Sequence, residues 1–264
     1  MKLGFIGTGN MASAIMGGII SKGVIPADEI IGADLFAPGR ERVKEKFGIH
    51  VTADNNEVVE KADVVLLSVK PQFYADVISG IKDKIRPDQI VITIAPGKTL
   101  SWLAEQFGKD VKIVRCMPNT PAMVGEGMTA ACPNEHMTEE EIEYVKTLLS
   151  SFSLVEIVPE KLMDTVTAVS GSSPAYVFMF IEAMADAAVL DGMPRAQAYK
   201  FAAQAVLGSA KMVLDTGKHP GELKDMVCSP AGTTIDAVRV LEECGFRGTI
   251  IDAVQTCAEK SRSL

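Results

Sequence analysis

Short apolar runs alternate with amphipathic segments along roughly the first 160 residues of the chain. Runs such as DVVLLSV (63–69) are apolar at almost every position, which is typical of strands buried on both faces of a parallel sheet. Helical patterns lie between these runs, for example over 10–22 and 37–47. Strands are predicted at Lys2–Ile6, Ile30–Asp34, Val64–Ser68, Ile90–Ile94 and Val111–Arg115, with a further pair near Thr129–Cys132 and Ser153–Val158. Alternation of this kind predicts βαβ units and an α/β fold.

The pattern changes near residue 160, beyond which only helical periodicity is found. Serine or proline at helix starts and glycine at helix ends mark the boundaries of the longest segments. Helices are predicted at Ser173–Gly192, Pro194–Gly217, Pro220–Val227, Thr234–Cys244 and Thr249–Arg262. We therefore predict two domains, an α/β domain over 1–160 and an all-helical domain over 161–264.

The predicted helices of the second domain carry apolar and alanine residues around most of their circumference. A helix without a polar face is buried on all sides, and roughly one hundred residues of helix cannot bury themselves that fully. The pattern therefore favours a homodimer formed through this domain. A self-contained helical bundle is the alternative.

Composition places the chain among folded proteins, with 264 residues of which 47% are hydrophobic and 23% charged. The net charge of −8 gives no reason to expect a nucleic-acid partner. Five cysteines are scattered without a CxxC pair, which is typical of reduced thiols in a cytoplasmic protein and argues against a structural metal site.

The apolar start of the chain does not read as a signal peptide, because two glycines interrupt it after Leu3–Ile6. The most apolar segment, in the second domain, carries Glu182 and Asp186. We therefore expect a soluble cytoplasmic protein without a membrane span.

A glycine-rich turn follows the first predicted strand and opens a helix. It reads Gly7-Thr8-Gly9-Asn10-Met11-Ala12, a G-x-G-x-x-A pattern. In dinucleotide-binding folds Gly7 would allow the tight turn, Gly9 would let the pyrophosphate approach the backbone, and Ala12 would let the helix pack close to the strand. The free N–H groups at the helix N-terminus would then face the phosphates. A plain tight turn is the alternative.

Asp34 stands at the end of the second predicted strand, where an acidic residue usually binds the ribose hydroxyls and favours NAD. Arg40 and Arg42 follow closely, and either would suit the extra phosphate of NADP. Both arginines also fit a solvated helix face. The sequence therefore predicts NADPH or NADH without deciding between them.

Three further polar turns follow predicted strands, at the edge where open α/β sheets bind their ligands. SVKPQ (68–72) contains Lys70, TIAPGKTL (93–100) contains a Pro-Gly pair, and RCMPNTPA (115–122) holds Asn119 between two prolines. Lys70 and Asn119 are therefore candidate cofactor contacts, although a surface lysine beside a proline turn has the same appearance.

Five motifs taken together resemble pyrroline-5-carboxylate reductase, and the resemblance covers essentially the whole chain in order. They are GFIGTGNMASAIMGG, VKP, RCMPNTPA, SGSSPAY and CSPAGTTIDAVRVLE. The most specific region is Pro220–Glu242. The resemblance implies a Rossmann-type doubly wound sheet followed by a helical dimerisation domain. It also implies hydride transfer from NAD(P)H to the C=N carbon of a cyclic imine, which gives proline, and often a decamer of five dimers.

The resemblance also assigns site residues by position. Cofactor residues would be Gly9, Asn10, Met11, Ala12, Asn55, Val69, Lys70, Pro71, Ala95 and Gly97. The substrate carboxylate would bind to Ser229, Gly232, Thr233 and Thr234. Two positions depart from the usual pattern, because Ser173 and Ala231 stand where the family has glycine. A positive φ at Ser173 would be strained.

The SPAGTTI segment has a chemistry of its own, because it opens a predicted helix. Free backbone N–H groups, two threonine hydroxyls and the helix dipole suit a carboxylate, although a simple threonine N-cap has the same pattern. The three histidines, His50, His136 and His219, fall in predicted loops away from the motifs, so none is a candidate general base. An imine arrives partly protonated and needs mainly positioning. We assign Thr234 the role of orienting the substrate.

Two other functions share parts of this pattern. A β-hydroxyacid dehydrogenase also joins a dinucleotide-binding domain to a helical one, but it places a lysine and an asparagine on the first long helix of the second domain. Here that helix reads PAYVFMFIEAMADAAV, with neither residue. A non-catalytic dinucleotide-binding regulator would keep the glycine turn but would not need the SPAGTTI segment.

Overall fold

One mixed sheet organises the first part of the chain in this computed structural model, which describes residues 2–263. Its strands are β1 (Leu3–Ile6), β2 (Ile30–Ala33), β3 (His50–Thr52), β4 (Val64–Leu67), β5 (Ile90–Thr93), β6 (Lys112–Met117), β7 (Gly127–Pro133) and β8 (Ser153–Ile157). Their order in the sheet is β3-β2-β1-β4-β5-β6-β7-β8. Neighbouring strands are parallel except for β6 and β7. The chain reverses direction across the sheet after β3, so the crevice between β1 and β4 is the expected ligand edge.

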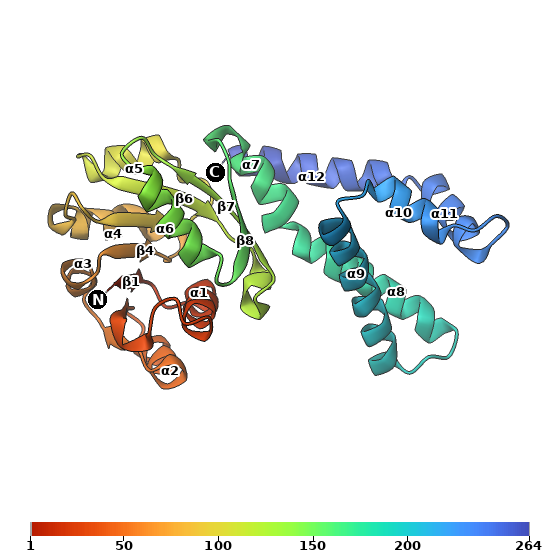
Figure 1. The fold of residues 1–264 in the computed structure, drawn as a ribbon, viewed down its shortest axis with the longest axis horizontal. Helices are drawn as coiled ribbons and strands as arrows, with labels where there is room; N and C mark the ends of the chain where they lie inside the picture. Colours follow the sequence, from red (N-terminus) through yellow and green to blue (C-terminus); the bar gives the residue numbers. More distant parts are fainter. Residues whose placement is uncertain (1, 264) are drawn as a thin grey trace. The chain divides into compact units, whose positions relative to one another are not determined.

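Helices cover both faces of this sheet (Figure 1). One face packs against α1 (Asn10–Ser21), α2 (Ala37–Phe47) and α6 (Glu139–Leu149), and the other packs against α3 (Asn55–Lys61), α4 (Tyr74–Ile81) and α5 (Leu100–Phe107). Along β1, Leu3 and Phe5 face the first layer, whereas Ile6 faces the second. This alternation follows from the period-two geometry of a strand and produces a three-layer sandwich.

Several helices begin at side chains that cap their free N–H groups. Asp54 accepts a hydrogen bond from the Asn56 N–H at α3, and Thr99 accepts one from the Trp102 N–H at α5. At α6, Thr138 and Glu141 form a reciprocal capping box. Such caps set the start of each helix, and therefore the length of the turn that precedes it.

Short helical turns fill the remaining connections. They are Ala27–Glu29, Pro71–Phe73, Lys82–Lys84, Thr120–Val124 and Glu160–Leu162, followed by the one-turn helix α7 (Met163–Val166) and a π-helical turn at Thr167–Gly171. The π-helical turn follows α7 directly and ends where α8 begins. Such turns are frequent at functional sites.

The chain divides into two compact units. Unit 1 comprises Met1–Ser172 together with Cys257–Leu264, and unit 2 comprises Ser173–Thr256. The helices of the second part are α8 (Ser173–Leu190), α9 (Arg195–Thr216), α10 (Pro220–Val227), α11 (Thr233–Glu243) and α12 (Phe246–Arg262). The last residues of α12 return to unit 1, where the Ser261 hydroxyl donates to Asp164 Oδ1 over 2.6 Å. Unit 2 is thus inserted between two segments of unit 1.

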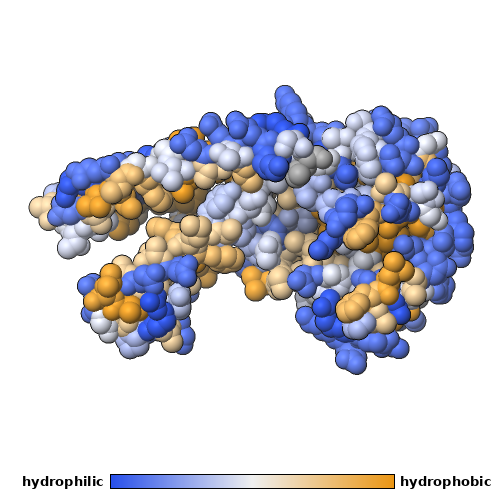
Figure 2. Space-filling model, turned by 180° about the vertical axis from the view of Figure 1, so that it is seen from behind, coloured by the Kyte–Doolittle hydropathy of each residue, from blue (hydrophilic) through white to orange (hydrophobic). Residues whose placement is uncertain are grey.

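Unit 2 leaves many large apolar side chains exposed. The helices α8 and α9 pack against each other as a hairpin, and small residues such as Ala185, Ala198 and Ala202 are buried. Phe201 is 63% exposed and Leu214 is 73% exposed on α9. Figure 2 shows apolar surface over the helices of this unit. Soluble monomers rarely leave so much contiguous apolar surface uncovered.

The predicted fold class is confirmed, with a Rossmann-type sheet followed by helices. Two details differ from expectation. Strand β3 is missing from the prediction, and His50, predicted in a loop, is the first residue of this strand. The division into functional domains at residue 160 stays a prediction. By contacts within the structure, unit 1 extends to residue 172.

Candidate active site

The glycine turn after β1 has the shape that a dinucleotide needs. Gly7 adopts a φ of 98°, and a Cβ at this position would lie 2.8 Å from the Ser68 carbonyl carbon and oxygen. No atom lies within 4 Å of the position that a Cβ on Gly9 would occupy. The first glycine therefore allows close packing, and the second leaves the backbone open to a phosphate.

The N-terminus of α1 offers free donors beside this opening. Gly9 is the N-cap of α1 and provides no side-chain hydrogen bond, and no acidic residue lies in the first turn. Asn10 is exposed, Met11 is half-buried, and Ala12 is buried against the sheet. The open N–H groups and the positive end of the helix dipole fit a pyrophosphate.

Asp34 is hydrogen-bonded to the glycine turn. Its Oδ2 accepts hydrogen bonds from the N–H of Thr8 over 2.8 Å and from the Thr8 hydroxyl over 3.0 Å, and its Oδ1 accepts from the Phe36 N–H over 2.9 Å. Thr8 itself is completely buried. The carboxylate therefore holds the turn in shape, besides lying where ribose hydroxyls are usually bound.

Two arginines close the same end of the site. Arg40 Nη1 donates to the carbonyl oxygen of Asp34 over 2.5 Å, and Arg42 Nη2 donates to the carbonyl oxygen of Thr8 over 3.0 Å. A carboxylate for ribose hydroxyls and two guanidinium groups for a phosphate thus lie together. The arrangement suits NADH and NADPH alike.

The turn after β4 is tied directly to the glycine turn. The Ser68 hydroxyl lies 2.7 Å from the carbonyl oxygen of Gly7 and 3.2 Å from that of Ile6. Lys70 is exposed, Val69 and Pro71 are half-buried, and Pro71 opens a short helical turn. The predicted contacts in this turn therefore lie next to the glycine turn, at the carboxyl ends of neighbouring strands β1 and β4.

The turn after β5 and the start of α3 carry the other predicted cofactor residues. Ala95 is buried, and Gly97 adopts a φ of 75° that favours glycine. Asn55 is the half-buried first residue of α3, directly after its capping residue Asp54. Strands β1, β4 and β5 are neighbours in the sheet, so their carboxyl-end turns share one edge.

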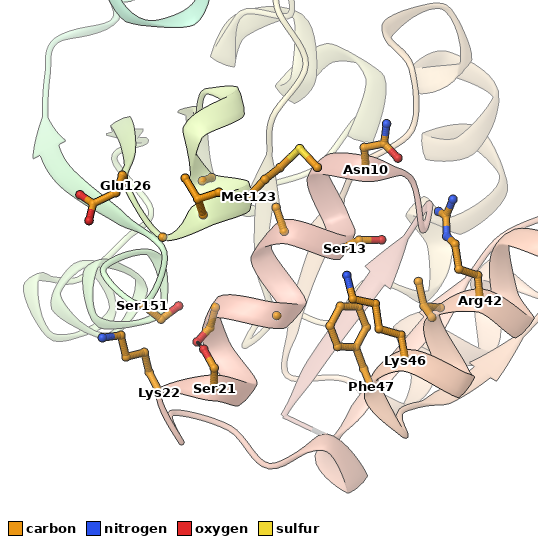
Figure 3. Close-up of a pocket in the computed structure, with 17 residues that line it drawn as sticks. Asn10, Ser13, Ser21, Lys22, Arg42, Lys46, Phe47, Met123, Glu126 and Ser151 are labelled. Carbon is orange, nitrogen blue, oxygen red and sulfur yellow. Dashed lines mark hydrogen bonds between the residues drawn. The ribbon is translucent and has the colours of Figure 1, made fainter. Parts of the chain in front are cut away.

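A cavity of about 650 Å³ runs along α1, between α2 and the turn Thr120–Val124. Figure 3 shows Asn10 and Arg42 at one end of this cavity and Ser21 and Lys22 at the other. Among the described residues that line it, Asn10 is a predicted cofactor residue and Arg42 is a candidate for the NADP phosphate. The cavity thus adjoins the glycine turn but does not include the turns after β4 and β5.

The predicted substrate residues form a tight turn within unit 2. The Gly232 N–H donates to the Ser229 carbonyl oxygen over 3.1 Å, which closes a turn over Pro230 and Ala231. Proline followed by a residue of positive φ is the pattern of a type II turn, and Ala231 has a φ of 55°. A Cβ on Gly232 would contact Ser229 Oγ and lie 3.1 Å from the Ser229 carbonyl oxygen, so a side chain at this position would require Ser229 to move.

Helix α11 begins directly after this turn with open donors. Its N-cap Gly232 supplies no side-chain hydrogen bond, and Thr233 and Thr234 are the first two helical residues. Within residues 2–263, neither threonine hydroxyl forms a hydrogen bond. An uncapped helix N-terminus with two free hydroxyls suits a carboxylate.

Comparisons with known proteins identify the family to which this chain belongs. Residues 160–264 match the family model of pyrroline-5-carboxylate reductase dimerisation, and residues 2–97 match the model of F420-dependent NADP oxidoreductases. The reductase of Escherichia coli is 53% identical over 100% of this chain and 98% of its own length. The chain belongs to the pyrroline-5-carboxylate reductase family. It is an NAD(P)H-dependent oxidoreductase.

Solved structures of the same family agree over nearly the whole reductase. The pyrroline-5-carboxylate reductase of Coxiella burnetii has a TM-score of 0.93 at 35% identity and covers 99% of this chain and 97% of its own. The Plasmodium falciparum enzyme, solved with NADP bound, has a TM-score of 0.90 at 33% identity and covers 100% of this chain and 97% of its own.

Asn119 of the reductase, predicted as a cofactor contact, is engaged within unit 1. Its Nδ2 donates to the Ser170 carbonyl oxygen over 3.0 Å, and its Oδ1 accepts from the Met128 N–H over 2.8 Å. The side chain thus joins β7 to the π-helical turn. This geometry indicates a structural role, and contact with the cofactor stays a prediction.

The two departures from the family's glycines differ in their structural effect. Ser173 is the first residue of α8 and is not strained. Ala231 is the one non-glycine residue with positive φ among the residues that the structure describes. The strain of a positive φ, which the sequence analysis considered at Ser173, therefore occurs at Ala231.

Sequence reasoning missed two residues of the reductase that shape the cofactor end, Thr8 and Ser68. Both support turns by hydrogen bonds to residues distant in the sequence, and a local pattern can mark their positions but not these partners. A polar residue directly between two turn glycines, or at the end of a buried strand, was the available signal.

Proposed function

We propose that the glycine turn and the turns after β4 and β5 hold NAD(P)H, and that the turn before α11 holds the substrate carboxylate. The activity is reduction of 1-pyrroline-5-carboxylate to L-proline, as expected for a member of this family. The observation that carries the substrate assignment is the uncapped N-terminus of α11 with two free threonine hydroxyls. The cofactor residues are Gly7, Gly9, Asn10, Met11, Ala12, Asp34, Asn55, Val69, Lys70, Pro71, Ala95, Gly97 and Asn119.

The cofactor supplies a hydride when it is bound, so the protein's own task is to orient the imine. The backbone N–H groups at the start of α11 would bind the carboxylate, assisted by Ser229 and Thr233. Thr234, which is half-buried, would direct its hydroxyl to the substrate nitrogen or carboxylate and fix the position of the C=N carbon.

None of the three histidines bonds to a proposed site residue in the part of the chain that the structure describes. This supports a reaction that depends on positioning of the substrate rather than on a histidine acid or base. His136 lies 3.7 Å from Asp110 and 3.8 Å from Glu135, and His219 accepts a hydrogen bond from the Gly221 N–H at the start of α10. His50 opens strand β3. A protonated imine needs no general acid at the nitrogen.

Replacement of Thr234 tests the assignment. Thr234→Ala should lower kcat/KM for pyrroline-5-carboxylate by about 10- to 100-fold, the effect of one lost hydrogen bond to a charged group, and Thr234→Ser should restore most of it. Steady-state assays with NADH and NADPH in parallel measure this and identify the preferred cofactor. Thr249→Ala is the control, because its hydroxyl donates to the carbonyl oxygen of Gly245, the residue that directly precedes α12. Unchanged activity in Thr234→Ala would remove this residue from the mechanism.

We further propose that residues 161–264 form the substrate and dimerisation domain and that 1–160 form the cofactor domain. We also propose that the enzyme is a cytoplasmic homodimer and that five such dimers assemble into a decamer. The match to the dimerisation family supports the dimer, as do the exposed apolar residues of α8 and α9. A helical run at Glu160–Leu190 is long and apolar enough for a membrane span by length and composition. A partner subunit would cover the same apolar surface, so we propose a soluble dimer. The net charge of −8 is our reason for proposing no nucleic-acid partner.

A further inference from the structure

The buried phenol of Tyr74 connects the turns after β4 and β5. Its hydroxyl donates to the Leu67 carbonyl oxygen over 2.6 Å and accepts from the Ile94 N–H over 3.3 Å. Leu67 is the last residue of β4, and Ile94 follows the last residue of β5. Tyr74 is completely buried, and burial raises the pKa of its phenol above the usual range, so it keeps the proton that it donates.

Glu160 holds the far end of the turn that Tyr74 holds at its start. Its Oε1 accepts from the Leu100 N–H over 2.7 Å and from Arg115 Nη1 over 2.8 Å. Leu100 is the first residue of α5, so this carboxylate also meets the positive end of the helix. Arg115 lies in β6 with its side chain 7% exposed, and the Glu160 side chain is 32% exposed, so the ion pair is partly buried.

The segment between these two anchors carries the predicted nicotinamide contacts Ala95 and Gly97. It begins at Ile94 and ends at Leu100, outside both β5 and α5 except for its last residue. Pro96 has no N–H, and Gly97 has the positive φ that only glycine adopts freely. The segment therefore depends on contacts at its ends for a defined position.

We propose that Tyr74 and Glu160 are positioning residues that fix the 94–100 segment at both ends and thereby set the nicotinamide side of the cofactor site. This inference rests on the proposed function only in identifying the segment as a cofactor contact. The two anchors themselves are hydrogen bonds within unit 1. A displacement of about 1 Å at such a segment is enough to impair hydride transfer strongly.

Hydrogen exchange in the cofactor-free protein tests the anchoring directly. Tyr74→Phe removes the hydroxyl that bonds Ile94, and Glu160→Ala removes the acceptor for Leu100. We expect amide exchange over 94–100 to become about tenfold faster in each variant, with exchange over 3–13 unchanged. Glu160→Gln keeps an acceptor oxygen for Leu100, so it should restore part of the protection and serves if Glu160→Ala does not fold.

Cofactor titration by nicotinamide fluorescence and steady-state kinetics provide the second measurement. The dissociation constant for the preferred cofactor should rise about tenfold in Tyr74→Phe and Glu160→Ala, with kcat/KM for the imine reduced to a similar extent and the KM for the imine little changed. When rates are normalised to the amount of folded protein, loss of a purely structural residue would not weaken cofactor binding while leaving the KM for the imine unchanged.

Two control variants remove comparable groups elsewhere in unit 1. Tyr144→Phe changes a half-exposed tyrosine on α6, and Glu141→Gln changes a carboxylate that bonds Lys112 and the Thr138 N–H. Both should leave exchange over 94–100 and cofactor affinity unchanged. Unchanged exchange over 94–100 in the test variants, or equal acceleration in all segments, would overturn the proposal. If exchange over 94–100 becomes faster in the test variants as expected, but the wild-type protein does not reduce the imine, only the proposed function is contradicted.

Discussion

Ala231 adopts a backbone conformation that alanine disfavours. Its φ of 55° lies in the left-handed region, where an L-residue with a Cβ is disfavoured. The turn requires this conformation because the Gly232 N–H bonds back to the Ser229 carbonyl oxygen across Pro230. The turn before α11, which we propose binds the substrate, is therefore built with strain that a glycine would avoid.

Replacing Ala231 by glycine should stabilise the enzyme. We expect Ala231→Gly to raise the free energy of unfolding by about 0.5–1 kcal/mol, because release of left-handed strain exceeds the added freedom of the unfolded chain. Urea denaturation at fixed protein concentration measures the effect. Ala237→Gly, in the interior of α11, is the matched control and should destabilise by about 1 kcal/mol. Equal effects at both positions would contradict the account of strain at Ala231.

At this scale the sequence predicts candidate cofactor residues but not the hydrogen bonds that hold them. Gly7, Gly9 and Ala12 follow from spacing alone, because each role depends on a missing or small side chain. The hydrogen bonds of Asp34 to Thr8, and the anchors Tyr74 and Glu160, join residues far apart in the chain. Such partners are created by folding and leave no local signal.

At the scale of elements, the approach of α1 to the segment before β8 depends on one glycine. A Cβ on Gly18 would lie 2.5 Å from the Cβ of Phe152 and 3.2 Å from the Ser151 carbonyl oxygen. Phe152 is almost completely buried, so it cannot move aside easily. The helix and this segment therefore pack at a distance that any larger residue would increase.

Gly18→Ala should destabilise the enzyme by about 1–2 kcal/mol, because overpacking outweighs the better helix propensity of alanine. Thermal unfolding followed by circular dichroism measures it. The control is Gly80→Ala in α4, where no atom lies within 4 Å of the added Cβ and alanine should stabilise by up to about 1 kcal/mol. A stabilised Gly18→Ala variant would show that the helix moves freely.

Elements with strong patterns could be predicted, and those without could not. The continuous apolar run of β4 and the Pro-to-Gly span of α9 were recognisable from the residues alone. Strand β3 has three residues and no buried side chain, so its pairing with β2 is set by the sheet rather than by its own sequence. The π-helical turn at Thr167–Gly171 likewise has no sequence pattern that distinguishes it from an α-helix.

At the scale of the whole molecule, the exposed apolar side chains of unit 2 predict that a single subunit is incomplete. Phe201→Glu should weaken the proposed dimer, with its dissociation constant raised by about 30-fold or more, because aromatic residues dominate interface energies. Sedimentation velocity over a range of concentrations measures the shift. Thr147→Glu, on the exposed side of α6 in unit 1, carries the same charge change and should leave the dimer intact. A dimer that is unaffected by Phe201→Glu would place the interface elsewhere.

The return of the chain to unit 1 through Cys257 and Ser261 affects how the enzyme is made. Ser172 and Asp164 receive their partners Cys257 and Ser261 only when residues 257–261 have been synthesised. At about 5–20 residues per second, the ribosome needs about 4–18 seconds to pass from Ser173 to Ser261. During this interval unit 1 lacks the two hydrogen bonds to Cys257 and Ser261, so we expect translation rate and early termination to affect its maturation.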